Sequence, residues 1–414
     1  MVNPMNSKNK IDSLIASADQ TSTRAQAFYC DEDVFALDMQ KVVMRKWLLV
    51  DHVSRIPEAG QFFLYEVGQE SIIVIRENDL KINALFNVCR HRGSLICLEK
   101  SGKRKRLTCP YHAWTYALDG SLKAANLMPE DFDPSAHGLF RCHIRVHHGF
   151  IFLNLSAGEE PDFDQDFAAF EPHLDYHGFA DAKIVHKESY PTDANWKLVV
   201  ENFFECYHCV PAHPEFCSRH PRDALIAMGA GPSSGPVDAL ERFAPVLEAW
   251  QQQAAELGRP MGTVDDDEHS EHMKAYLQRP HRSDIKSETQ DGQPVACLMG
   301  KRTSFDHGRM YMSFSPFNHI IACNDFAALI VFTPRGVMQT DVEISWLVDG
   351  KADAVDIDRM IWMWDVTTLQ DKEIIENNQR GIISSRYQPG RLSTQERRVD
   401  TFNKWYFNQL IKQG

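Results

Sequence analysis

The hydrophobic and polar positions along the chain change their period several times, and each period predicts a different element. Apolar residues recur at helical spacing between Asp31 and Val50, so we expect a short helix that leads into the first sheet. Runs of β-branched and aromatic residues then follow, separated by turn residues, which is typical of antiparallel strands. The predicted strands cover 61–67, 71–76, 82–88, 121–124, 143–146 and 150–155. This stretch therefore predicts a small antiparallel β domain at about residues 40–155.

The second half of the chain combines helical and extended patterns. A predicted strand at 184–190 is followed by Pro191 and then by apolar residues at helical spacing from Trp196 to Tyr207. In the less regular stretch 218–300 we expect mobile or substrate-facing elements, with a loop at 229–235 and an acidic turn at 264–268. Further strands are predicted at 310–315, 320–324, 327–332 and 339–347, and helices at 237–257, 353–378 and 397–411.

Together these patterns predict an α+β fold with two domains. At 414 residues the chain is long for one hydrophobic core and fits two. We divide it into an N-terminal arm and helix (1–40), the antiparallel β domain (41–160) and a larger domain (161–414) whose antiparallel sheet is flanked by helices. The acidic, proline-containing stretch 156–182 is the predicted linker.

Two short runs in the β domain each pair a cysteine with a histidine. They are Cys89-Arg90-His91 and Cys109-Pro110-Tyr111-His112. A Rieske [2Fe–2S] cluster needs two thiolates on one iron and two imidazoles on the other, so each run could supply one ligand to each iron. The alternative is a zinc site with two cysteines and two histidines, but its usual spacing places the cysteines in one pair and the histidines in the other. Because both pairs here are mixed, the sequence favours the iron–sulfur cluster.

The remaining cysteines show no further pair of ligands, so a second cluster is not expected. Disulfides are rare in cytosolic proteins, and we expect these thiols to be small buried side chains. They are Cys30, Cys97, Cys142, Cys206, Cys209, Cys217, Cys297 and Cys323.

Composition and charge exclude several other classes. With 43% hydrophobic and 24% charged residues, the chain is typical of a globular protein. A net charge of −13 argues against nucleic-acid binding, since phosphates need a basic surface. The basic run 103–106 lies between the two Cys/His pairs, and we interpret it as a solvated turn or as a patch for an acidic electron donor. The chain has no apolar run that could span a membrane and no apolar signal-peptide core, so we expect a cytoplasmic protein without a membrane anchor.

A second candidate metal site follows the helix that starts at Trp196. Glu205 and His208 are three residues apart and would share a helix face. His208 and His213 are five apart, and Pro211 between them disturbs the helix, so that both imidazoles could reach one ion. A pair of histidines alone is weak evidence, because most histidines are surface or core residues. A cluster that delivers single electrons needs an acceptor, however, and iron held by two histidines and one carboxylate is the common site for O2 chemistry.

The carboxylate ligand should come from the predicted helix at 353–378. Its acidic residues are Asp356, Asp358, Asp365, Asp371, Glu373 and Glu376. Asp371 falls on one stripe with Trp364 and Ile375, so we expect this acid to face inward. A solvated acidic face of the helix is the alternative.

These runs resemble the catalytic (α) subunits of the Rieske non-haem iron oxygenases over nearly the whole chain. The similarity is greatest to the branch of glycine-betaine, proline-betaine (stachydrine) and carnitine monooxygenases, and it lies in the segments 195–198, 205–209, 364–371, 376–381 and 387–390. The resemblance implies that the cluster ligands are Cys89, His91, Cys109 and His112. It also implies that His208, His213 and Asp371 hold a mononuclear Fe(II).

The resemblance further implies a reaction and partners. The chain would be the oxygenase component of a monooxygenase that hydroxylates or oxidatively N-demethylates a small quaternary ammonium substrate, with O2 and with electrons from NAD(P)H through a separate flavin and iron–sulfur reductase. It would form a homotrimer in which Glu205 bridges between His112 of one subunit and His208 of the next. Asn202, beside these positions, either lines the open face of the iron or is a buried structural amide.

Two other functions stay open at this point. One is a ring-hydroxylating dioxygenase that acts on an aromatic acid, and the other is a non-catalytic Rieske electron-transfer protein. A trimethylammonium substrate would need aromatic faces, since a desolvated cation–π contact contributes about 2 kcal/mol. Arg335 could pair with a substrate carboxylate. The aromatic candidates are Phe204, Tyr311, Phe314, Phe317 and Trp346, although aromatic residues on strands more often belong to a core.

Overall fold

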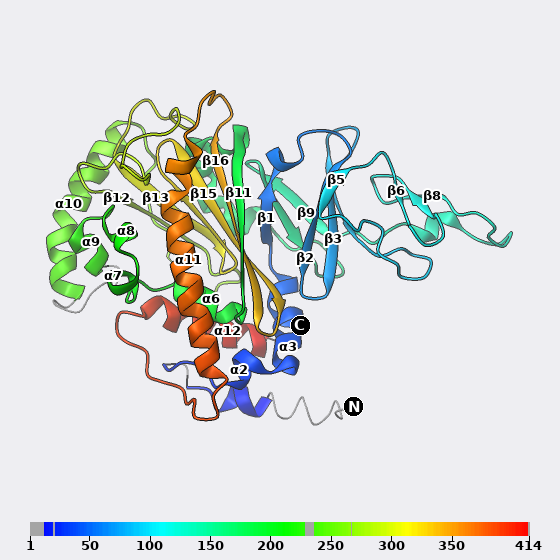
Figure 1. Cartoon of the computed structure of the whole chain (residues 1–414), viewed down its shortest axis with the longest axis horizontal. Helices are drawn as coiled ribbons and strands as arrows, with labels where there is room; N and C mark the ends of the chain where they lie inside the picture. The colour runs from blue at the N-terminus through cyan, green and yellow to red at the C-terminus, as the bar shows by residue number, and fades with distance from the viewer. Residues whose placement is uncertain (1–11, 20, 228–235, 266, 413–414) are drawn as a thin grey trace.

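The computed structural model describes residues 12–19, 21–227, 236–265 and 267–412. Figure 1 shows a smaller β domain that projects along the long axis of the molecule from a larger domain with a broad sheet. The predicted α+β fold is therefore confirmed. None of the helices in these ranges has both the length and the apolar character that a membrane span needs. The predicted loop at 229–235 lies outside the described residues.

The smaller domain consists of three antiparallel sheets, with strand orders β1-β10-β9, β4-β3-β2-β5 and β6-β7-β8. Alternate residues of β3 point to different cores, as the period of a strand requires. Ile72 and Val74 pack into a core that is shared with the larger domain, whereas Ile73 and Ile75 pack beneath the cysteine–histidine runs. The strands are β1 Leu48–His52, β2 Gln61–Val67, β3 Glu70–Arg76, β4 Ile82–Phe86, β5 Ser101–Lys103, β6 Leu107–Thr108, β7 Thr115–Tyr116, β8 Leu122–Ala124, β9 His143–His147 and β10 Phe150–Asn154.

The larger domain is built on one six-stranded antiparallel sheet with the order β11-β16-β15-β14-β13-β12. Every residue of β13 and β14 is buried, so both faces of the sheet are covered. The sequence pattern did not predict β12, because this edge strand mixes polar and apolar residues. The strands are β11 Ala182–Thr192, β12 Ala275–Pro280, β13 Gly308–Ser315, β14 Asn318–Ala322, β15 Phe326–Gly336 and β16 Gln339–Asp349.

Helix α11 (Ile357–Ile382) runs across one face of this sheet (Figure 1), and α6 (Trp196–Phe203) packs against it. The last helix, α12 (Arg397–Ile411), matches its predicted range. The other α-helices are α2 Ala27–Cys30, α3 Glu32–Lys41, α4 Asp164–Phe167, α5 Glu171–His177, α7 Cys209–Ala212, α8 Pro214–Cys217, α9 Arg222–Ala227 and α10 Pro236–Glu256. Short 3-10 turns are η1 Val43–Arg45, η2 Val53–Arg55, η3 Pro134–His137, η4 Ala168–Phe170 and η5 Phe179–Asp181.

Helix α3 is bonded to the larger domain through Asp38, a fully buried carboxylate. Asp38 accepts hydrogen bonds from Trp196 Nε1 at 3.1 Å and from Tyr406 OH at 2.5 Å, and it forms an ion pair with the buried Lys197. Loss of one partner of such a pair costs about 3–5 kcal/mol, because the other charge is left buried. The N-terminal segment therefore fixes the start of α6 and, with it, the residues that follow this helix.

The helix predicted from Trp196 to Tyr207 ends earlier than expected. Helix α6 stops at Phe203, and residues 204–208 turn before α7 begins. A helix cannot easily continue through this region because the ring of Pro211 would clash with the carbonyl of Tyr207, four residues before it. Glu205 and His208 therefore meet across a turn and not on one helix face, which corrects the prediction.

Candidate active site and cluster loops

The two cysteine–histidine runs form neighbouring loops at the outer end of the β domain, beside β6 and β7 (Figure 1). Cys89 and Cys109 are buried, whereas His91 and His112 are exposed. The Nδ1 atoms of the two imidazoles are 3.2 Å apart. The thiols thus lie on the protein side of the loops and the imidazoles on the solvent side, which is the arrangement that a cluster with one iron near the surface needs.

Polar groups around the thiols would tune such a cluster. The hydroxyl of Tyr116 lies 3.3 Å from Cys89 Sγ, in a position that the sequence did not single out. Burial raises the pKa of Cys89. Burial acts in the same direction on Cys109, but the backbone N–H groups of Tyr111 and His112 point at its sulfur and lower its pKa. Hydrogen bonds of this kind set the potential of a sulfur-ligated cluster.

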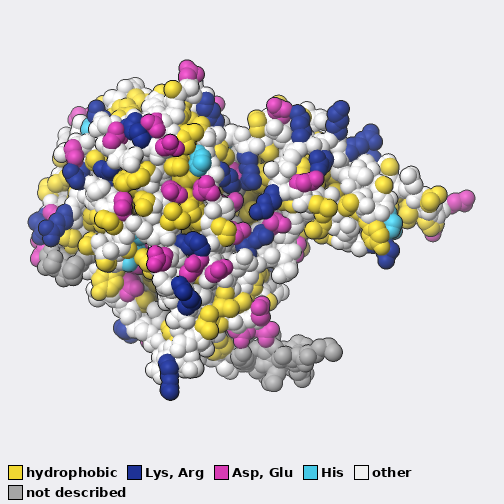
Figure 2. All heavy atoms as spheres, in the orientation of Figure 1, with side chains coloured by type: hydrophobic (Ala, Val, Ile, Leu, Met, Phe, Trp, Pro, Cys, Tyr) yellow, Lys and Arg dark blue, Asp and Glu magenta, His cyan; other side chains and the backbone are white. Residues whose placement is uncertain are grey.

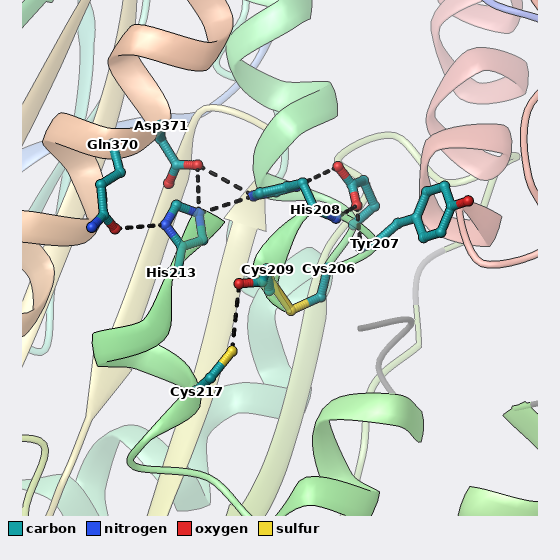
Figure 3. The surroundings of a disulfide bond; sticks show 9 residues. Cys206, Tyr207, His208, Cys209, His213, Cys217, Gln370 and Asp371 are labelled. Atoms are coloured by element: carbon teal, nitrogen blue, oxygen red, sulfur yellow. Dashed lines mark hydrogen bonds and ion pairs between the residues drawn. A yellow bond between two sulfur atoms is a disulfide. The ribbon is translucent and has the colours of Figure 1, made fainter. Parts of the chain in front are cut away.

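The second site brings together the three residues that were predicted as iron ligands (Figure 3). His208 Nε2 and His213 Nε2 are 3.1 Å apart, and Asp371 Oδ1 lies 3.3 Å from the first and 3.0 Å from the second. Neighbouring ligands of an octahedral ion at about 2.1 Å lie about 3 Å from each other. The donor set therefore fits one transition-metal ion, with two imidazoles and one carboxylate on one side of it.

The other nitrogen of each imidazole is fixed by a neighbouring side chain. Glu205 Oε1 lies 2.5 Å from His208 Nδ1, and Gln370 Oε1 lies 2.8 Å from His213 Nδ1. Both Nε2 atoms are thereby directed at Asp371, which is how such partners orient metal ligands. Burial lowers the pKa of His208, but Asp371 and Glu205 together raise it to about 9. Sequence reasoning identified Glu205 but missed Gln370, whose only signal is its place beside Asp371.

The turn between these ligands contains a disulfide that the sequence analysis did not expect. Cys206 and Cys209, predicted as free buried thiols, are bonded to each other next to His208 (Figure 3). Their Cα atoms are 4.9 Å apart, inside the range for a disulfide. Of the other predicted free thiols, Cys97, Cys142 and Cys323 are buried, whereas Cys297 is exposed.

A cavity of about 700 Å³ opens beside the two histidines and Asp371. Asn202 and Glu205 line it, as do Phe204 and Tyr311 from the predicted aromatic set. Phe314, Phe317 and Trp346 do not line it and pack in the hydrophobic cores, which is the alternative expected for aromatic residues on strands. The elements at 240, 264–265 and 275–279 also reach the cavity, as expected for the irregular stretch 218–300.

Two predicted basic features lie elsewhere. Arg335 does not line the cavity but pairs with Glu66 of the β domain at 3.0 Å and with Asp341 at 3.4 Å, which corrects its prediction as a substrate partner. Its position at the end of β15, against β2, could not be foreseen from local sequence. The run 103–106 is exposed, and Figure 2 shows Lys and Arg side chains gathered over that part of the β domain. A docking role of the run stays a prediction.

Two family models match the chain. A "Rieske [2Fe-2S] domain" matches residues 46–136, and a "Ring hydroxylating alpha subunit (catalytic domain)" matches residues 179–411. The first contains both cysteine–histidine runs, and the second contains the two histidines and Asp371. These matches identify the cluster as iron–sulfur and not zinc, and the chain as an enzyme and not a non-catalytic electron carrier.

Several characterised proteins are similar to the chain. It is 36% identical to the glycine betaine monooxygenase oxygenase subunit of Chromohalobacter salexigens, over 93% of this chain and 85% of the relative. It is 34% identical to the glycine betaine monooxygenase oxygenase subunit of Pseudomonas aeruginosa, over 96% of this chain and 91% of the relative. The carnitine monooxygenase oxygenase subunit of Escherichia coli is 34% identical over 50% of this chain and 56% of the relative.

Solved structures agree with this assignment. The quaternary ammonium Rieske monooxygenase CntA, in complex with an inhibitor, superposes with a TM-score of 0.69 at 25% identity, over 97% of both chains. Naphthalene 1,2-dioxygenase from Rhodococcus shares the fold, with a TM-score of 0.66 at 18% identity over 99% of both chains. The chain therefore belongs to the Rieske non-haem iron oxygenases, as a catalytic α subunit with a Rieske [2Fe–2S] cluster and a mononuclear iron.

Proposed function

We propose that this chain is the oxygenase component of a monooxygenase that hydroxylates or oxidatively N-demethylates a small, betaine-like quaternary ammonium substrate. The observation that carries the proposal is the open cavity beside His208, His213 and Asp371, in a chain that is similar over nearly its whole length to two glycine betaine monooxygenase subunits. Polar residues line this cavity, whereas a pocket for an unsubstituted aromatic ring would be purely apolar.

The reaction balances as a two-electron monooxygenation. One atom of O2 enters a C–H bond of an N-methyl group, and the other is reduced to water with two electrons and two protons. The product, an N-hydroxymethyl ammonium, loses formaldehyde and a proton and leaves the demethylated amine. When bound, the iron supplies the activation of O2, and the cluster supplies the electrons. Product release therefore requires cleavage of the C–N bond after hydroxylation.

The residues take distinct roles in this proposal. His208, His213 and Asp371 hold the iron, while Glu205 and Gln370 fix the orientation of the two imidazoles. Asn202 borders the cavity near the open side of the site and can direct a hydrogen bond toward a substrate. The cavity walls keep the reacting methyl group beside the iron.

The electron path in this proposal crosses between subunits. The imidazoles of His91 and His112 are exposed. Strand β6, next to the second cysteine–histidine run, lies toward one end of the long axis, whereas α7, next to His208, lies toward the other end (Figure 1). A homotrimer would place His112 of one subunit near Glu205 of the next, and this carboxylate already contacts His208. Inter-subunit electron transfer is described for a quaternary ammonium Rieske monooxygenase of the same fold, at 24% identity. An NAD(P)H-dependent flavin and iron–sulfur reductase would supply the electrons in the cytoplasm.

The test is product analysis with the reconstituted holoenzyme and a surrogate reductase. With glycine betaine or carnitine, we expect formaldehyde to appear in a one-to-one ratio with the O2 consumed. A series of aromatic acids serves as the comparison. Formation of a cis-diol from an aromatic acid, without formaldehyde from any betaine, would replace this function with that of a ring-hydroxylating dioxygenase.

A further inference from the structure

One wall of the active-site cavity carries two arginines that lie directly opposite each other. Strands β12 and β13 are paired so that Arg279 faces Arg309, and both side chains line the cavity. Like charges in opposite positions of neighbouring strands are destabilising. Such a pair persists only where counter-charges stabilise it.

Arg309 has its counter-charge within the protein. Its Nη1 lies 3.0 Å from Oε1 of Glu288, a fully buried carboxylate. Glu288 also accepts a hydrogen bond from Trp364 Nε1 at 3.2 Å. Against the effect of burial, Arg309 and the histidines around this carboxylate hold the pKa of Glu288 well below its usual range. The charge of Glu288 is therefore already paired with Arg309 and does not neutralise a second arginine.

Arg279 has no such partner. Within the described part of the chain no acidic side chain pairs with it, and its Nε is buried without a hydrogen-bond partner. Its guanidinium lies 5.9 Å from the ring centroid of Phe243. Burial, and then the charge of Arg309, lower the pKa of Arg279 to about 10, so it stays cationic at neutral pH. A half-buried cation without a counter-charge is costly, and an anionic ligand would offset that cost.

Three of the aromatic rings that line the cavity, those of Phe204, Tyr311 and Phe216, are already in contact with arginines. The guanidinium of Arg398 lies 4.0 Å from the ring centroid of Phe204 and 5.0 Å from that of Tyr311, and it donates a hydrogen bond to the Tyr311 hydroxyl. Arg309 lies 5.5 Å from the ring of Phe216. A trimethylammonium group would meet positive charge at each of these rings. Of the described residues, three acids line the cavity. Asp265 is exposed, so water screens its attraction, whereas Glu205 and Asp371 are already paired with the histidines of the metal site.

We propose that this cavity recognises its substrate mainly through a carboxylate that is bound by Arg279, and that the ammonium group contributes little to affinity. The guanidinium fork can hold a carboxylate in two parallel hydrogen bonds, which fixes the substrate at the end away from the reacting methyl group. The inference rests on the proposed function and specifies which half of a betaine the enzyme selects. It makes Arg279 a specificity-determining residue.

The test is a comparison of three probes by calorimetry with the reduced holoenzyme under argon, where no turnover occurs. Glycine betaine carries both groups, tert-butylacetate carries the carboxylate without the charge on nitrogen, and choline carries the ammonium without the carboxylate. We expect the Kd of tert-butylacetate to lie within about tenfold of that of glycine betaine, and choline to bind at least about 100-fold more weakly. Comparable binding of choline and glycine betaine, or no binding of either carboxylate, would overturn the proposal.

Arg279→Gln should weaken both carboxylate probes about 30-fold, since it removes a charge-assisted hydrogen bond. The matched control is Arg397→Gln, which removes the same charge from an exposed residue at the cavity rim and should change the Kd less than about threefold. The melting temperature of Arg279→Gln should not fall, because an unpaired buried charge is lost, and this shows that the variant is folded. Unchanged carboxylate binding by folded Arg279→Gln would also overturn the proposal.

Formaldehyde release separates this inference from the function on which it rests. Carboxylate binding that depends on Arg279, without formaldehyde from any betaine, would leave the carboxylate subsite standing and remove the demethylase. Formaldehyde release together with equal affinity for choline and glycine betaine would support the demethylase and overturn the carboxylate subsite.

Discussion

The cluster loops and the iron site use similar ligand types in opposite surroundings. The four cluster ligands come from residues 89–112, on two adjacent loops, and both imidazoles are exposed. The iron ligands come from two turns of the chain and a distant helix, α11, and His213 is buried with only 2% of its side chain exposed. Exposure suits a site that must pass electrons to another molecule, whereas burial suits a site that must control access to O2.

The supporting contacts differ in the same way. Around the cluster, backbone N–H groups and Tyr116 reach the thiols from within the same short segment. Around the iron, Glu205 and Gln370 come from elements that lie far apart in sequence, and α6 is anchored by the buried Asp38 and Lys197. The cluster is thus a local structure, whereas the iron site depends on the packing of the whole larger domain. A mutation at one site should therefore leave the metal content of the other site unchanged.

The largest effect is expected at Asp371. Asp371→Ala removes the carboxylate ligand, so product formation should fall by at least about 1,000-fold and metal content should drop from about three to about two irons per chain. The visible spectrum of the cluster should remain, because the two sites share no ligand. Glu373→Ala is the matched control, an exposed acid on the same helix that should keep full iron content. Loss of the cluster spectrum in Asp371→Ala would show that the sites are not independent.

Cys109→Ala should give the reciprocal result. Loss of a buried thiolate ligand should remove the cluster and its colour, and turnover should again fall by about 1,000-fold because no electrons reach the iron. About one iron per chain should remain, detectable by elemental analysis. Cys297→Ala, at an exposed free thiol, is the control and should keep the cluster. If turnover persisted without the cluster, electrons would have to enter the iron site by another route.

A smaller effect is expected from Glu205→Gln, which keeps a side chain of the same size at the residue that we propose to connect the two sites. The amide can still accept a hydrogen bond from His208 Nδ1, but it lacks the negative charge that the imidazole now faces. We expect turnover to fall about 100-fold while both metals are retained. Rapid-mixing measurements should show slow reoxidation of a reduced cluster, and Glu205→Asp should recover part of the rate. Loss of the mononuclear iron instead would limit Glu205 to a structural role.

The same contrast explains how much the sequence could predict. The cluster ligands were predicted because their spacing alone indicates a Rieske cluster. They are Cys89, His91, Cys109 and His112. Six of the ten strands of the β domain were predicted to within about two residues, since the hydrophobic alternation that identifies them is local. Strand β1 was missed because it overlaps the stretch 31–50 that was predicted as a helix, and β5, β6 and β7 were missed because each has only two or three residues.

What depends on tertiary packing was not predictable in this way. Phe314, Phe317 and Trp346 lie on or beside strands of a sheet that is covered on both faces, so periodicity cannot tell a cavity wall from a core. The unpaired state of Arg279 follows from the register of an edge strand that the pattern did not show. The Cys206–Cys209 disulfide was not predicted because these thiols were judged from the rarity of disulfides in cytosolic proteins and not from their spacing.

The smallest effect is expected at Gln370, which precedes the ligand Asp371 in sequence and contacts His213, a residue far from it in sequence. Gln370→Leu removes the hydrogen bond to His213 Nδ1 and leaves all three ligands in place. We expect about a tenfold loss of iron affinity, measured by competition with a chelator, and an intact cluster spectrum. Glu215 accepts a hydrogen bond from Gln370 Nε2 at 3.0 Å, so Glu215→Gln should have a weaker effect of the same kind. If Gln370→Leu left the affinity unchanged, packing alone would orient His213, and the iron site would be as self-contained as the cluster loops.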